Sequence, residues 1–113
     1  MQLKKVTTRT GFWVLLGSRR SQAAAMNIAP GGKEGGPRNR HRGAEQWLYV
    51  LAGTGIAKLA RRTVRLRRGT LLLIERGERH EIRNVGATAL RTLNFYSPPA
   101  YTPAGNERPA AKP

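Results

Sequence analysis

Two histidines are the side chains of this chain best suited to hold a cation or to move a proton near neutral pH. His41 lies among arginines in the run PRNRHRGAEQ, and His80 lies in the run ERGERHEIRN. Each stands beside a glycine-containing turn, and the two do not form a helical i, i+4 pair. The chain has no cysteine, so thiolate metal sites and disulfides are excluded. Because arginines repel cations and attract phosphates, the run around His41 predicts either part of a metal site or part of a nucleic-acid-binding patch.

Short strands must position these residues. Apolar stretches alternate with turn signals along the chain, and no long helical period occurs. This pattern favours an all-β sandwich or barrel, with strands expected at 12–18, 24–29, 46–51, 55–60, 63–67, 70–75, 81–83 and 90–96. The run TVRLRRG alternates strictly, so its arginines are expected on the solvated face of a sheet. The run LLLIE does not alternate, as expected for a strand covered on both faces, and we expect GGKEGGP to be a flexible loop at the barrel mouth.

Length and composition indicate one domain followed by a short tail. A chain of 113 residues corresponds to a single domain with a modest core, which we place at residues 1–97. Residues 98–113 hold five of the 7 prolines. Since proline lacks the N–H that a sheet ladder needs, this segment is expected to wrap loosely or to be disordered. No apolar run approaches the roughly 20 residues of a membrane span, and FWVLL is too short for a signal peptide, so we expect a soluble, cytoplasmic protein.

The charge is strongly positive, with 21 Lys and Arg against 6 Asp and Glu and a net charge of +15. Such a balance attracts polyanions. On an extended chain Arg38, Arg40 and Arg42 share one face, and Asn39 and His41 share the other, so an arginine-rich side and a cation-binding side can coexist. The sequence has no zinc-finger spacing, RNA-binding aromatic motif or basic helix. The charge therefore predicts non-specific nucleic-acid binding that weakens as salt rises.

Two spacings carry a resemblance to the cupin superfamily. The run GTLLLIERGERHEIRN is similar to the second cupin signature, G-x5-P-x-G-x2-H-x3-N, with a glutamate at the proline position and His80 at the histidine. The first signature, G-x5-H-x-H-x3/4-E-x6-G, aligns when it is counted back from Gly53. Gln46 then occupies the glutamate position, and His41 and Asn39 occupy the positions of the two histidines.

The resemblance implies a small single-domain cupin, a double-stranded β-barrel of the jelly-roll kind, with its core at 24–96. Cupins gather three histidines and a glutamate inside the barrel around a divalent Mn, Fe, Ni or Zn ion. The implied ligand set, in which amides replace one histidine and the glutamate, is His41, His80, Gln46 and Asn39. A bulge in the strand would instead turn Glu45 toward the site, and this alternative stays open.

Several functions are compatible with this resemblance. Four residues are candidates to contact a bound ligand: Trp47, Leu48, Val50 and Ile82. The protein could be a metal-dependent enzyme, dioxygenase-like or isomerase-like, acting on a small oxygenated or anionic substrate. It could also be a non-catalytic module that binds a small ligand or a metal, or a basic nucleic-acid-associated protein, because fold alone does not determine chemistry. The resemblance further implies a homodimer formed through N-terminal strands, and the apolar run GFWVLLG would suit that interface.

Overall fold

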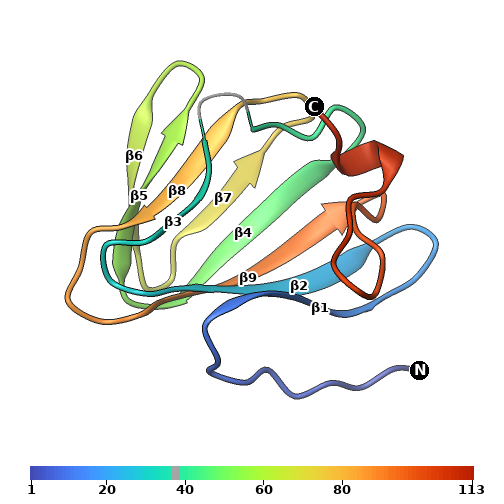
Figure 1. Ribbon diagram of the computed structural model, residues 1–113, viewed down its shortest axis with the longest axis horizontal. Helices are drawn as coiled ribbons and strands as arrows, with labels where there is room; N and C mark the ends of the chain where they lie inside the picture. Colours follow the sequence, from blue (N-terminus) through green and yellow to red (C-terminus); the bar gives the residue numbers. More distant parts are fainter. Residues whose placement is uncertain (37–38) are drawn as a thin grey trace.

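The computed structural model describes residues 1–36 and 39–113 and contains two antiparallel sheets (Figure 1). The first sheet, in the order β1-β2-β9-β4-β7, consists of β1 (Gly11–Gly17), β2 (Gln22–Ile28), β9 (Leu90–Ser97), β4 (Glu45–Ala52) and β7 (Leu71–Ile74). The second sheet, in the order β3-β8-β5-β6, consists of β3 (Lys33–Gly35), β8 (His80–Asn84), β5 (Thr54–Leu59) and β6 (Thr63–Arg67). A short 3-10 helix, Pro109–Ala111, lies near the C-terminus, and no helix in the described residues is long and apolar enough to cross a membrane. Pro37 and Arg38 fall outside the described residues, and so does the expected role of Arg38 in an arginine-rich side.

The core lies between the sheets because alternate residues of each strand turn inward. On β4, Leu48 and Val50 are fully buried, whereas Trp47 is 38% exposed. On β6, Leu66 is buried and both of its neighbours are exposed, as the alternation predicted. The main apolar cluster is formed by Met26, Ile28, Leu48, Val50, Ala57, Leu66, Ile82 and Leu90. The prediction of an all-β, double-stranded barrel is confirmed.

Two local expectations differ from the structure. The run GGKEGGP was expected to be a loop, but Lys33–Gly35 forms the edge strand β3, which pairs with β8. Three residues flanked by glycines carry too short a pattern to be read as a strand. The run LLLIE was expected to be covered on both faces, but Leu71 is 59% exposed, because β7 is an edge strand whose outer face has no layer over it.

The proline-rich C-terminal segment also differs from the prediction. We expected residues 98–113 to be loose or disordered, but Ala100 and Ala111 are fully buried. The amide of Arg42 donates to the carbonyl of Lys112 at 3.2 Å, and the amide of Gly43 donates to the carbonyl of Ala110 at 3.0 Å. The prediction was wrong because proline bars a segment from a central sheet but does not prevent the alanines beside it from packing. In Figure 1 the segment crosses the end of the first sheet.

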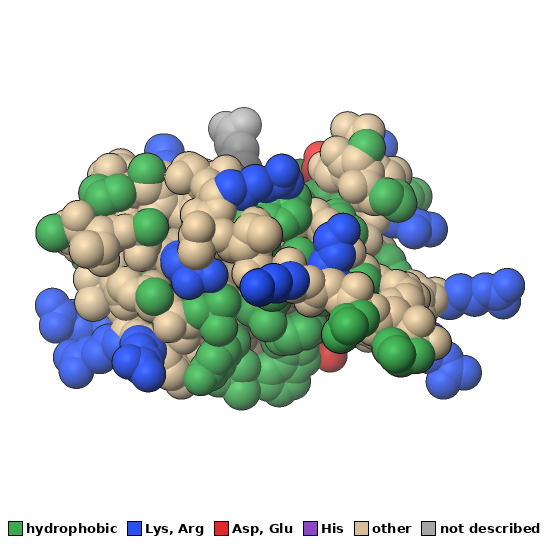
Figure 2. Space-filling model, turned by 90° about the horizontal axis from the view of Figure 1, so that it is seen from below, with side chains coloured by type: hydrophobic (Ala, Val, Ile, Leu, Met, Phe, Trp, Pro, Cys, Tyr) green, Lys and Arg blue, Asp and Glu red, His purple; other side chains and the backbone are tan. Residues whose placement is uncertain are grey.

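The outer faces of the two sheets carry different side chains. Residues paired across neighbouring strands project on the same side of a sheet, and those on the outside of the first sheet are largely apolar. We call this the apolar face; it comprises Trp47, Tyr49, Leu71, Leu73, Leu93 and Phe95. The outside of the second sheet is rich in cations, and we call it the basic face; it comprises Lys33, Lys58, Arg65, Arg67 and Arg83. Seen from below, apolar side chains form one continuous area, with Lys and Arg side chains projecting beyond it (Figure 2).

Candidate functional site

A cavity of about 180 Å³ opens between the two sheets. Both sheets and the C-terminal segment contribute to its wall, because inward-facing residues from β1, β2, β3, β4, β8 and β9 converge there. Its lining residues are Phe12, Met26, Glu34, Gly35, Asn39, His41, Gln46, His80, Ile82, Tyr96 and Tyr101. The structure thus brings together all four residues of the implied ligand set, although they are spread over more than forty positions of the chain.

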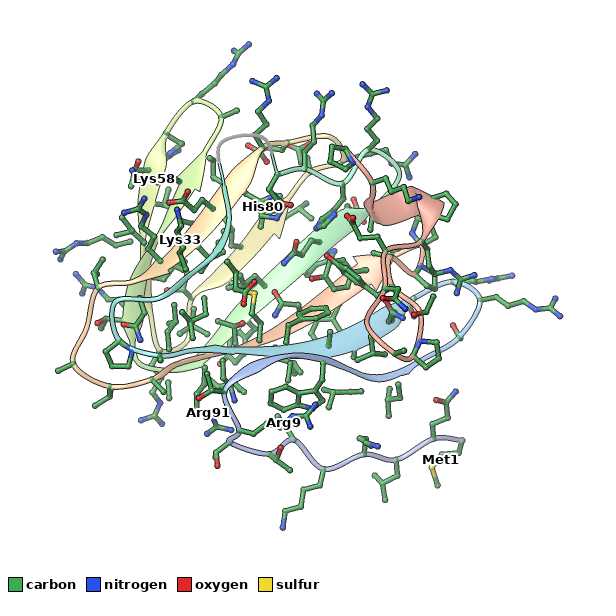
Figure 3. All side chains as sticks on the ribbon, in the orientation of Figure 1. Met1, Arg9, Lys33, Lys58, His80 and Arg91 are labelled. Carbon is green, nitrogen blue, oxygen red and sulfur yellow. The ribbon has the colours of Figure 1, made fainter. Side chains whose placement is uncertain are left out.

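His80, which is labelled in Figure 3, begins β8, and its ring makes two hydrogen bonds. Its Nδ1 lies 3.1 Å from the carbonyl oxygen of Glu78, and since a carbonyl only accepts, Nδ1 must carry the proton. Its Nε2 is then an acceptor and receives a hydrogen bond from Nδ2 of Asn39 at 3.0 Å. Burial lowers the pKa of His80 to about 4, helped by the nearby His41 and opposed by the bond to Glu78. His80 is therefore neutral at pH 7 and presents an electron pair on Nε2.

His41 reaches the same arrangement with a distant partner. It is buried, and its Nδ1 lies 2.9 Å from the carbonyl oxygen of Ala111. Nδ1 therefore donates, and in an uncharged ring this leaves Nε2 as the acceptor nitrogen. The ring centroids of His41 and His80 are 5.1 Å apart. Imidazoles that hold a metal through one nitrogen commonly donate the other N–H to a backbone carbonyl, and both rings meet this condition.

Gln46 is oriented by a directed chain of hydrogen bonds. Its Nε2 donates to Oδ1 of Asn94 at 2.9 Å, and Nδ2 of Asn94 donates to Oγ1 of Thr92 at 3.0 Å. The Thr92 hydroxyl in turn donates to the carbonyl of Met26 at 2.7 Å. Because the last acceptor is a carbonyl, the direction of every bond is settled, and Oε1 of Gln46 is the free end. Among the described residues this oxygen is buried without a hydrogen-bond partner, so it calls for a cation or a donor in the cavity.

Asn39 lies beside His80 but turns a donor toward it. Its Nδ2 also lies 3.4 Å from the backbone carbonyl of His80, so the amide nitrogen, not the oxygen, faces this residue. An amide nitrogen is a poor cation ligand, whereas the amide oxygen is a suitable one. Asn39 would therefore bind a cation only after its amide rotates to present Oδ1.

The cavity is also lined by one carboxylate and two phenols, which sequence reasoning did not identify. Glu34 points inward from β3, and burial raises the pKa of its carboxyl. Tyr96 and Tyr101 meet edge to face with ring centroids 5.2 Å apart. Burial raises the pKa of Tyr96 well above 10 and that of Tyr101 to about 12. Both phenols are therefore neutral donors at pH 7, and the inward phase of β3 is the one signal that could have indicated Glu34.

The remaining candidates lie at the rim or away from the cavity. Glu45 is half-buried at the start of β4 and does not line the cavity. Trp47 projects from the apolar face, is 38% exposed and does not line the cavity. Leu48 and Val50 belong to the apolar core rather than to the cavity wall, whereas Ile82 lines the cavity.

The donor set of the cavity suits a divalent transition metal. In residues 1–36 and 39–113, no three His, Cys, Asp or Glu side chains are grouped to hold a metal ion. Two imidazole nitrogens and an unpartnered amide oxygen are nonetheless ligands that Mn, Fe, Ni and Zn accept. The unsatisfied Oε1 of Gln46 is the observation that fits such an ion.

Comparison with known proteins agrees with this architecture. The family model of the cupin domain matches residues 24–96, and the chain belongs to this family. It is 32% identical over 78 residues to the tetracenomycin polyketide synthase protein TcmJ of Streptomyces glaucescens. The aligned region covers 69% of this chain and 51% of TcmJ. The chain therefore spans about half the length of that relative.

Solved structures share the fold. BH2720 from Bacillus halodurans has a TM-score of 0.77 at 24% identity, covering 89% of this chain and 79% of that one. A predicted oxalate decarboxylase from Thermotoga maritima has a TM-score of 0.69 at 26% identity, covering 78% of this chain and 79% of that one.

Proposed function

We propose that this cupin binds a divalent Mn, Fe, Ni or Zn ion inside the barrel and, through it, a small oxygenated or anionic ligand. The supporting observation is the convergence of three lone pairs on one cavity. His41 and His80 both line the cavity and both use Nδ1 on a backbone carbonyl, which leaves Nε2 for a cation, and Gln46 adds a buried oxygen that has no partner among the described residues. Three neutral ligands leave the full charge of the ion available to attract an oxygen of the ligand.

The side chains that line the cavity have different chemical roles in this proposal. His41, His80 and Gln46 would hold the metal, which when bound polarises a ligand oxygen. Asn39 would give up its hydrogen bond to His80 and then either complete the metal site through Oδ1 or donate to the ligand. Glu34 could accept a proton from the ligand, and the Tyr101 hydroxyl could donate to one of its oxygens.

The cavity limits the size of this ligand. Its volume of about 180 Å³ corresponds to roughly six water molecules at about 30 Å³ each. The similar Thermotoga maritima protein is a predicted oxalate decarboxylase, and oxalate, with six non-hydrogen atoms, is a small oxygenated anion of this size. If the bound ligand is converted to a product, the protein is an enzyme; if it is only bound, the protein is a non-catalytic module.

Metal titration of the purified protein tests this proposal. We expect calorimetry with Mn²⁺, Ni²⁺ and Zn²⁺ to show one site per chain after treatment with a chelator. His80→Ala should abolish binding and retain the β-type circular dichroism spectrum, because His80 lines a cavity. Ile82→Val, on the same strand and the same wall, is the matched control and should bind metal like the parent. Equal metal content in His80→Ala and the parent would refute the proposal.

A further inference from the structure

The C-terminal segment touches the candidate site at the ring of His41. The carbonyl oxygens of Ala110 and Lys112 accept hydrogen bonds from the amides of Gly43 and Arg42 at 3.0 and 3.2 Å. Between them, the carbonyl of Ala111 receives Nδ1–H of His41 at 2.9 Å. The three successive carbonyls of residues 110–112 thus accept hydrogen bonds from the three successive residues 41–43.

We propose that residues 98–113 are a working part of the site, in which the Ala111 carbonyl positions His41. A neutral imidazole has two tautomers, and the one that carries its proton on Nε2 cannot bind a metal through that atom. The Ala111 carbonyl accepts from Nδ1 and so selects the tautomer that leaves Nε2 unprotonated. The metal-binding part of this inference rests on the function proposed above, whereas the tautomer does not depend on it.

The same segment also supplies part of the cavity wall. Tyr101 lines the cavity and packs against Phe12 with ring centroids 4.7 Å apart. Gln22 anchors this stretch: its Nε2 donates to the Tyr101 carbonyl at 2.6 Å. Its Oε1 accepts from the amides of Ala100 and Tyr101 at 3.2 and 3.0 Å. The segment is therefore fixed at both of the points where it meets the site.

Gly43 allows the segment to come this close. A β-carbon at residue 43 would lie 2.9 Å from Cα and 3.3 Å from Cβ of Ala110. These distances are too short for both segments of the chain to stay in place. Gly43→Ala should therefore push Ala110 and the adjoining Ala111 carbonyl away from His41. Gly36 offers a matched control, because a β-carbon there would meet nothing within 4 Å.

His80 provides a control within the same molecule. Its Nδ1 donates to the carbonyl of Glu78, only two residues away, whereas the partner of His41 is seventy residues away. Displacing the C-terminal segment should change the tautomer of His41 and leave that of His80 unchanged. A general loosening of the barrel would alter both rings.

Nitrogen-15 NMR of the ring nitrogens in metal-free protein tests the positioning role. In the parent we expect both histidines as the tautomer protonated at Nδ1. In Gly43→Ala, His41 should become a mixture that includes the Nε2-protonated form, with His80 unchanged. Ala111→Leu, which overfills a fully buried position, should have the same effect, and it keeps the test available if Gly43→Ala does not fold. Gly36→Ala and Lys112→Leu, an exposed neighbour in the segment, should match the parent.

Zinc calorimetry on the same variants extends the test to function. Loss of an outer-shell partner typically weakens metal binding about 10- to 100-fold, so Gly43→Ala and Ala111→Leu should bind Zn²⁺ at least about tenfold more weakly than their controls. If His41 keeps the Nδ1-protonated form in both variants, the positioning role is overturned even where the parent binds zinc. If the tautomer changes but the parent binds no zinc, the proposed function fails and the positioning of His41 stands.

Discussion

At the residue scale, the glutamine at position 46 fills a place that the family resemblance assigns to a carboxylate. Gln46→Glu would put a charged oxygen beside the metal ligands, and unit charges 4 Å apart attract by about 4 kcal/mol at an effective dielectric constant near 20. The same change places two acceptors against each other, because Oδ1 of Asn94 now receives the Gln46 amide. Asn94 cannot simply rotate, since the Thr92 hydroxyl already donates to the Met26 carbonyl.

We therefore predict that Gln46→Glu has opposite effects on binding and on stability. Affinity for Mn²⁺ or Zn²⁺ should rise at least about tenfold, because the attraction exceeds the roughly 1.4 kcal/mol that a tenfold change needs. The free energy of unfolding of the metal-free protein should fall by about 1–3 kcal/mol. Calorimetry and urea unfolding measure the two quantities. Glu45→Ala is the control and should change neither by much, because Glu45 does not line the cavity. Loss of binding in Glu45→Ala, with no effect of Gln46→Glu, would assign the ligand role to Glu45.

His80 makes the stability of the metal-free protein depend on pH. Burial lowers its pKa from 6.5 to about 4 in the folded protein, so below pH 6.5 the unfolded chain binds the proton first. Stability should be level above about pH 6.5 and should fall by up to about 3 kcal/mol as the pH drops toward 4. Burial raises the pKa of Glu34, which acts in the opposite direction, so the effect is measured as a difference. Urea unfolding of the parent and His80→Gln between pH 7 and 4 should converge at low pH; parallel curves would contradict this prediction.

The residues found from the sequence and those missed differ in how their positions are determined. Spacings within two short runs predicted four of the cavity residues: His41, Gln46, Asn39 and His80. Such spacings are informative because the phase of a strand determines which residues turn inward. Glu34 was missed because its strand is three residues long. The direction of the Gln46 amide depends on partners on β9 and β2, and the His41 tautomer depends on a carbonyl at the other end of the chain. Neither can be read from a local pattern.

At the element scale, the sequence was informative wherever a strand has one buried and one solvated face. Eight strands were expected within one or two residues of their observed bounds, such as 46–51 against Glu45–Ala52 and 90–96 against Leu90–Ser97. The short edge strand β3 and the packed C-terminal segment were not expected. Both are held by partners far away in the sequence, and local composition is silent on such partners.

The apolar face predicts that two copies associate through the first sheet. Trp47, Tyr49 and Phe95 are each 38–40% exposed, and they are joined by cross-strand pairing into one area. An exposed apolar area of this kind marks an interaction site. The run GFWVLLG, from which we expected a dimer contact, forms β1 at the edge of this sheet, where the Arg9 guanidinium covers Trp13 at 4.3 Å from the ring centroid.

Light scattering should give twice the 12.5 kDa mass of the chain, and Phe95→Glu should reduce it to the monomer mass, because a buried, unpaired carboxylate is costly at an interface. Val85→Glu is the matched control: Val85 is an exposed apolar residue, 61% accessible, that lies outside the apolar face. The control should remain a dimer. A monomeric parent at micromolar concentration would rule out this contact.

At the scale of the whole molecule, the two sheets divide surface chemistry between them. The apolar face belongs to the first sheet and the basic face to the second. Within the basic face, Lys33 pairs with Arg83 across β3 and β8, and Arg83 and Arg65 flank Ile56 of β5. Glu81 lies next to these cations and forms an ion pair with Arg83. In a dimer joined through the apolar faces, both basic faces would remain open to solvent.

This arrangement gives the last prediction, which concerns the net charge of +15. Duplex DNA and RNA should bind through phosphate contacts, indifferent to sequence. If the five cations of the basic face all take part, affinity should fall with salt with a logarithmic slope of about −4 to −5, near −0.9 per contact. The double variant Lys58→Glu with Arg65→Glu should weaken binding and flatten this slope. Its control, Lys4→Glu with Lys5→Glu, changes the net charge equally but on the exposed N-terminal segment. If the two double variants lose equal affinity, binding depends on net charge and not on the basic face. Tight, sequence-selective binding at physiological salt would favour a nucleic-acid function for the protein.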